Sequence, residues 1–176
     1  MFGQVNDQLK GELKAFWSQY GKAYQEELIS FRSVSRNRHG VVEQIDLLKK
    51  PLSRQPAAIS RDQSGAINGI VFVVLRELED SLALGSHAYF QRMYMLPEAR
   101  RKVRGIATPL ANKLFEEFLI GFDRAVEQRD HRAKVLLSEN INPGLQKASM
   151  RRYFARLGFQ MLGRNQLDGE VWSKKT

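Results

Sequence analysis

The stretch LPEARRKVRGIATPL, from Leu96 to Leu110, joins two different kinds of predicted structure. The residues before it, His87–Leu96, are rich in aromatic and methionine side chains and predict a strand that Pro97 ends. The residues after it, from Thr108 to about Phe122, carry apolar side chains at helical spacing and predict an amphipathic helix. A strand, a basic loop that contains glycine, and a helix therefore follow one another here.

The loop within this stretch has the features of an anion site. The first N–H groups of a helix have no partner inside the helix and carry the positive end of its dipole. Gly105 lets a bulky anion approach the backbone, and phosphate groups bind well at such a place. The alternative is a solvated loop. The loop fits neither of two common phosphate-binding patterns, GxxxxGK[ST] and GxGxxG. Its basic residues are Arg100, Arg101, Lys102 and Arg104.

The rest of the chain alternates between helical and strand-like patterns. A helix is expected from Val5 to Phe31, capped by Asn6 or Asp7, and Gly21 is a point at which it could divide into two. The further expected elements are a loop over 32–40, a strand or helix at Val41–Leu48, strands at Ala57–Arg61, Ala66–Leu75 and Ala133–Leu137, a helix at Leu145–Leu157 that ends at Gly158, and strands at Phe159–Leu162 and Glu170–Ser173. This order predicts a mixed α/β layer fold of the α+β type.

Composition narrows the classes of function. The 176 residues include no cysteine, which excludes disulfides, thiolate metal sites and a thiol nucleophile. The three histidines have no metal-ligand spacing, so no metal is expected. A net charge of +9 attracts polyanions such as nucleic acid or a phosphorylated cofactor. Without an apolar run of membrane-spanning length or a secretory signal, we expect a cytoplasmic protein with no membrane span.

Two blocks of the sequence resemble the GNAT superfamily of acyl-CoA N-acyltransferases. Lys102-Val-Arg-Gly-Ile-Ala107 is similar to the family's [Q/R]-x-x-G-x-[G/A] loop, and MYMLPEAR before it is similar to the strand that leads in. SMRRYFARLGF, Ser149–Phe159, is similar to the family's late helix. The chain departs from the pattern at Lys102, where Gln or Arg is usual, and at Phe154, where the tyrosine often falls.

The resemblance covers roughly residues 57–176 and implies a fold. That fold is a central mixed, mainly antiparallel sheet flanked by helices, here with an N-terminal helical segment. Residues 1–176 would form a single domain. Within it, 1–50 would lie on the substrate side and 57–176 would form the sheet and the acyl-CoA-binding core.

The resemblance also implies a cofactor, acetyl-CoA or another acyl-CoA, without a metal. Met95 would offer backbone groups to the pantetheine arm, and Arg100, Arg101 or Arg104 would reach the 3′-phosphate. The pyrophosphate would be held in the loop that Lys102 opens, by the backbone amides of Val103, Arg104, Gly105, Ile106, Ala107 and Thr108.

Catalysis in this family is mainly positioning, together with removal of a proton from the amine and protonation of the departing thiolate. Tyr153 is the candidate acid, because it is the one hydroxyl on the late helix that suits this role. Glu139, at the end of a strand, is the leading candidate base. Glu43, Asp46 and His87 are the alternatives.

Three functions remain open from the sequence. The first is an N-acyltransferase whose amine acceptor is either small or associated with nucleic acid. The second is a catalytically degenerate scaffold of the same fold that binds nucleic acid or an assembly partner, and the third is an unrelated basic nucleic-acid binder. The oligomeric state stays open, a homo-oligomer included. Four basic residues of the late helix would continue the anion track, face a polyanion or simply be solvated: Lys147, Arg151, Arg152 and Arg156.

Overall fold

The computed structural model describes residues 5–35, 52–78, 83–100, 109–165 and 168–176, and residues 27–35 through their backbone alone. The predicted order of helices and strands is confirmed, while the segment Val41–Leu48 lies outside the described residues. No helix in these ranges is both long and apolar enough to cross a membrane. The elements are α1 (Asp7–Ser35), β1 (Ser53–Arg61), β2 (Ile67–Glu77), β3 (His87–Met95), η2 (Pro97–Arg100), α2 (Leu110–Arg124), η3 (Val126–Gln128), β4 (Ala133–Asn140), η4 (Pro143–Gln146), α3 (Ala148–Arg156), β5 (Gln160–Arg164) and β6 (Glu170–Lys175).

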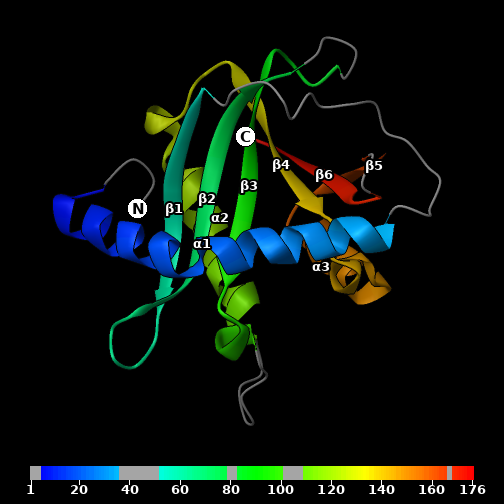
Figure 1. Cartoon of the computed structure of the whole chain (residues 1–176). Helices are drawn as coiled ribbons and strands as arrows, with labels where there is room; N and C mark the ends of the chain where they lie inside the picture. Colours follow the sequence, from blue (N-terminus) through cyan, green and yellow to red (C-terminus); the bar gives the residue numbers. More distant parts are fainter. Residues whose placement is uncertain (1–4, 36–51, 79–82, 101–108, 166–167) are drawn as a thin grey trace. The chain divides into compact units, whose positions relative to one another are not determined.

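The strands form one six-stranded sheet in the order β1-β2-β3-β4-β6-β5 (Figure 1). A tight turn over 62–66 joins β1 to β2, and such a turn joins antiparallel neighbours. β3 and β4 run parallel, whereas β6 is antiparallel to both β4 and β5. The predicted mixed, mainly antiparallel sheet is therefore confirmed. Its outer strands are irregular, because Pro56 lies within β1 and the pairing of β5 shifts between Met161 and Gly163.

Contacts along the chain divide it into two compact units. The first unit comprises Met1–Gly21, Arg54–Val73 and Arg92–Arg129. The second comprises Lys22–Ser53, Val74–Gln91 and Asp130–Thr176. The single domain expected over residues 1–176 stays a prediction.

The start of α1 resolves an alternative that the sequence left open. The side chain of Asn6 accepts a hydrogen bond from the backbone N–H of Leu9 at 2.8 Å, so Asn6 is the cap. Asp7 instead lies in the first turn and pairs with Lys10 at 2.9 Å. Gly21 does not divide the helix, which runs on to Ser35 and past the end of the predicted range. A Cβ added at Gly21 would lie 3.9 Å from the ring of Trp17, an ordinary van der Waals contact.

In the first unit, β2 is covered on both faces. On one face, the Trp17 ring of α1 meets Phe72 edge-on, with centroids 5.9 Å apart. On the other face, Leu114 of α2 lies close against Gly69. Because neighbouring residues of a strand point to opposite faces, this two-sided cover explains the continuous apolar run Ile70–Leu75.

Helix α3 begins three residues later than the sequence predicts. The Asn142 side chain accepts a hydrogen bond from the backbone N–H of Gly144 at 2.8 Å, which closes the 3-10 turn Pro143–Gln146. Lys147 is then extended, with φ −71° and ψ 152°, before the helix starts. The end of the helix is confirmed, because Gly158 has φ +84° and the N–H of the next residue bonds back into the last turn.

Gly69 is where we expect added bulk to disturb the first unit most directly. A Cβ at Gly69 would lie 2.5 Å from the Ser60 Oγ and 3.1 Å from Leu114. The Ser60 hydroxyl donates to Asn68 at 2.6 Å and so has little freedom to move. We expect Gly69→Ala to lower the free energy of unfolding by about 1–3 kcal/mol, measured by urea titration.

The control is Gly11→Ala, since a Cβ at that helical position meets nothing within 4 Å. It should raise the free energy of unfolding by about 0.5–1 kcal/mol, because glycine is the poorer helix former. Equal effects of the two substitutions would show that the fit around Gly69 is not tight.

Candidate functional site

The end of β3 is held in place by the arginine that follows it. Arg100 Nε donates to the backbone carbonyl of Met95 at 2.7 Å, and the guanidinium lies 5.4 Å from the centroid of the Tyr94 ring. Met95 is 3% exposed. The predicted cofactor residues Met95 and Arg100 are thus neighbours, and Arg100 is fixed against the strand end.

The N-terminus of α2 follows the basic loop closely. Its cap residue is Pro109, which offers no side-chain hydrogen bond, and the first turn contains no acidic residue. The positive end of the helix dipole is therefore not neutralised by a carboxylate from its own first turn. The predicted loop residues Arg101, Lys102, Val103, Arg104, Gly105, Ile106, Ala107 and Thr108 lie outside the described residues.

The parallel ladder between β3 and β4 stops before β3 does. The last paired residues are Gln91 and Ser138, whereas β3 continues to Met95. In the second unit, this last pair is also joined through its side chains, since Ser138 Oγ donates to Gln91 Oε1 at 3.0 Å in a buried position. Two polar side chains thus mark the point where the register ends.

Asn140, two residues further along β4, lies in the same polar region. Its side chain is on the same face of the strand as that of Ser138, and the residue is 2% exposed. The Nδ2 atom has no hydrogen-bond partner among the described residues, which is costly for a buried amide. Sequence reasoning missed Gln91, Ser138 and Asn140. The signal was available in the run Ser-Glu-Asn at the end of an otherwise apolar strand.

The two candidate catalytic residues lie on opposite faces of the sheet in the second unit. Tyr153 belongs to α3, is 7% exposed, and its ring lies beneath the guanidinium of Arg156 at 5.9 Å. Trp172 packs on Phe154 of α3, so its side chain lies on the face of the sheet that α3 covers. Ser138 is the ladder partner of Trp172 and therefore points to the same face. Glu139 follows Ser138 and so points to the other face, where its Oε1 accepts from Asn165 at 3.0 Å.

The alternative bases are not placed beside these residues. His87 begins β3, at the opposite end of the strand from Met95, and its Nδ1 lies 2.9 Å from Ser86 Oγ. Asp130, a nearby carboxylate, pairs with Arg132 at 2.7 Å, and hydrogen bonds from Arg132 lower the pKa of Asp130 well below its usual range. Glu43 and Asp46 lie outside the described residues.

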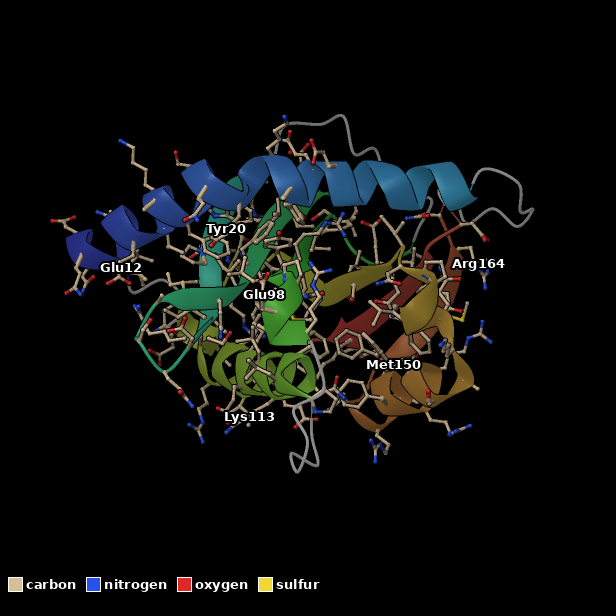
Figure 2. All side chains as sticks on the ribbon, turned by 60° about the horizontal axis from the view of Figure 1, so that its bottom comes forward. Glu12, Tyr20, Glu98, Lys113, Met150 and Arg164 are labelled. Carbon is tan, nitrogen blue, oxygen red and sulfur yellow. The ribbon has the colours of Figure 1, made fainter. Side chains whose placement is uncertain are left out.

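A buried carboxylate, Glu170, joins α3 to β6. It is fully buried, and its Oε1 accepts from Arg151 Nε at 2.8 Å while its Oε2 accepts from Trp172 Nε1 at 3.2 Å. Arg164 of β5 approaches the same Oε1 at 3.4 Å (Figure 2 labels Arg164). The sequence reading took Glu170 only as part of a strand. The signal that could have found it is Trp172, which lies two residues on and therefore on the same face.

The described residues contain no group of three or more histidine, aspartate or glutamate side chains that could hold a metal ion. Among the described residues, the polar features set out above are the end of β3 with Arg100 in the first unit, and the polar end of β4 and the Glu170 cluster in the second.

Substitution of Arg151 tests how much its hydrogen bond to Glu170 contributes to the stability of the fold. In Arg151→Met, the fully buried carboxylate keeps Trp172 and the longer contact to Arg164. We expect the free energy of unfolding to fall by about 1–3 kcal/mol in a urea titration. The matched control is the neighbouring, exposed Arg152→Met, which should change it by less than about 0.5 kcal/mol. A loss no larger than that of the control would mean that Arg151 is not needed to stabilise Glu170.

Comparison with known proteins gives limited similarity. No family model matches the chain, and no curated protein matches it. Among solved structures, the chain is similar to a bacterial toxin, with 18% identity and a TM-score of 0.39 over 64% of this chain. It spans 62% of that toxin chain, less than two thirds of its length. It is also similar to a chain of the KacTA–DNA complex, with 15% identity and a TM-score of 0.39 over 92% of this chain and 78% of that one. Similarity at this level carries no argument about activity.

Proposed function

We propose that this chain is an acyl-CoA-dependent N-acyltransferase that moves an acyl group, most simply acetyl, from coenzyme A to an amine. The observation that carries the proposal is the end of β3. The strand outruns its parallel ladder with β4 by four residues, Arg92–Met95, and then leads through η2 into the basic loop and α2. A strand end with backbone beyond the ladder suits an extended pantetheine arm, and a helix start suits a pyrophosphate.

The cofactor would be held mainly by backbone groups and arginine. The Met95 carbonyl already accepts from Arg100, but a carbonyl oxygen has two lone pairs and accepts a second donor. The amides of Val103–Thr108 and the uncompensated start of α2 would hold the pyrophosphate. Arg100 would add a charged hydrogen bond to a phosphate from its fixed position at the strand end.

The proposed chemistry is direct transfer without a covalent enzyme intermediate. The amine nitrogen attacks the thioester carbon, the carbon–sulfur bond breaks, and the amide bond forms. Glu139 takes the proton from the amine, and Tyr153 gives a proton to the departing sulfur. The nitrogen and the sulfur are bonded to the same carbon during the transfer, so side chains on opposite faces of the sheet in the second unit do not both reach them directly. The assignment therefore requires the amine proton to pass to Glu139 through water.

A second function is favoured by the surroundings of the same two residues. Tyr153 is 7% exposed and packed between Phe154 and Arg156, and Glu139 already accepts a hydrogen bond from Asn165. These contacts suit structural roles. The alternative is therefore a scaffold of the same fold that binds acyl-CoA or a partner without turnover.

Cofactor binding is tested by Gly105→Trp. An indole at this loop position would block approach of the pyrophosphate to the backbone. We expect the affinity for acetyl-CoA and for CoA to fall at least about 10-fold, measured by isothermal titration calorimetry. Gly11→Trp is the control, because a Cβ at this exposed position on α1 meets nothing within 4 Å. Unchanged affinity in Gly105→Trp would refute the phosphate assignment.

The acid role is tested by Tyr153→Phe, which keeps the ring and removes only the hydroxyl. We expect kcat for amine acylation to fall about 100-fold or more, with the CoA affinity unchanged. Tyr89→Phe is the control: it removes a hydroxyl that accepts from the backbone N–H of Asp130 at 2.8 Å and should leave kcat unchanged. An unchanged kcat in Tyr153→Phe would exclude the acid role. Binding of acetyl-CoA by the unaltered protein, without turnover of any amine in a broad panel, would support the scaffold instead.

A further inference from the structure

The C-terminal part of the second unit has an uneven distribution of charge. From residue 147 onward, the sequence has seven basic residues and two acidic ones, Asp168 and Glu170. The basic residues are Lys147, Arg151, Arg152, Arg156, Arg164, Lys174 and Lys175.

Both acidic residues are turned inward. Glu170 is fully buried and bonded to Arg151, and Asp168 is 6% exposed and pairs with Arg164 at 2.9 Å. The exposed charged side chains described in this segment are therefore all basic. Side chains that end in nitrogen project from α3 near Met150 in Figure 2.

Two arginines of α3 repel each other, although one of them, Arg156, also lies over the Tyr153 ring. Arg152 and Arg156 are four residues apart, so they are neighbours on one side of the helix, and like charges at this spacing repel. Helix α3, with the sequence ASMRRYFAR, has no acidic residue to compensate them. The side chain of Lys174 lies near the end of the helix, since its Cε would be 3.9 Å from a Cβ added at Gly158.

We propose that this basic surface, defined as Arg152, Arg156 and Lys174, binds the sugar–phosphate backbone of a nucleic acid. The planar guanidinium groups match phosphate, and the net charge of +9 attracts a polyanion from a distance. None of the large exposed apolar side chains among the described residues belongs to α3. Protein interfaces need such anchors, whereas nucleic-acid interfaces are polar and positive. The inference goes beyond acyl transfer and does not depend on it.

The test measures binding of a fluorescently labelled 20-base-pair RNA duplex by anisotropy, between 50 and 200 mM NaCl. Arg152→Glu/Arg156→Glu is compared with Lys14→Glu/Lys113→Glu, which makes the same change in net charge at exposed positions on α1 and α2. We expect the α3 variant to lose at least about 10-fold in affinity and its salt slope to flatten by roughly 1.8, the value for two lost phosphate contacts on duplex DNA. The control should lose no more than about 2-fold.

Three results would overturn the proposal. One is no binding by the unaltered protein at 50 mM NaCl, and another is an equal loss in both double variants, since net charge alone would then explain the affinity. The third is displacement of the RNA by poly-glutamate as efficiently as by unlabelled RNA, which would indicate an acidic protein partner. Circular dichroism checks the fold. If charge reversal unfolds the chain, Arg152→Gln/Arg156→Gln gives the same comparison with a smaller expected loss.

Discussion

The parallel pairing of β3 with β4 is the constraint on which the rest of the structure depends. Two parallel neighbours cannot be joined by a tight turn, so the chain must return along the sheet before β4 begins. That return is the segment Leu96–Arg132, which contains η2, the basic loop and α2. The strand end, the cluster of positive charge and the start of a helix thus follow one another because of this pairing.

A second constraint acts on α3. The buried carboxylate of Glu170 takes hydrogen bonds from a helix residue, Arg151, and from Trp172 of its own strand, with Arg164 of β5 close by. A buried charge is tolerated only when it is paired and bonded in this way. In the segment from residue 147 onward, both carboxylates, Asp168 and Glu170, are buried and bonded to arginine. The exposed charged side chains of this segment are therefore arginines and lysines.

The order of helices and strands was predictable because the spacing of apolar residues along the sequence reflects which side chains are buried. The run Ile70–Leu75 indicated a strand covered on both faces, and Gly158 indicated the end of α3. The predicted start of α3 at Leu145 was wrong. The Asn142 side chain accepts a hydrogen bond from the Gly144 N–H, residues 143–146 form a 3-10 turn, and the extended Lys147 separates that turn from the helix. The division at Gly21 that the sequence left open does not occur, since a glycine weakens a helix without ending it. For the site, Met95 and Arg100 proved to be neighbours. The polar trio Gln91, Ser138 and Asn140 was missed, because periodicity does not show which strands become adjacent.

The irregular outer strands have a consequence for the protein at high concentration. An edge strand with an unbroken row of free amide donors and carbonyl acceptors can pair with strands of other molecules, which starts aggregation. In β1, Pro56 has no backbone N–H and so makes the strand irregular, and in β5 the pairing shifts before Gly163, which has φ +147°. Both margins therefore discourage growth of the sheet by addition of further copies, even though Met161 and Leu162 leave apolar surface exposed on β5.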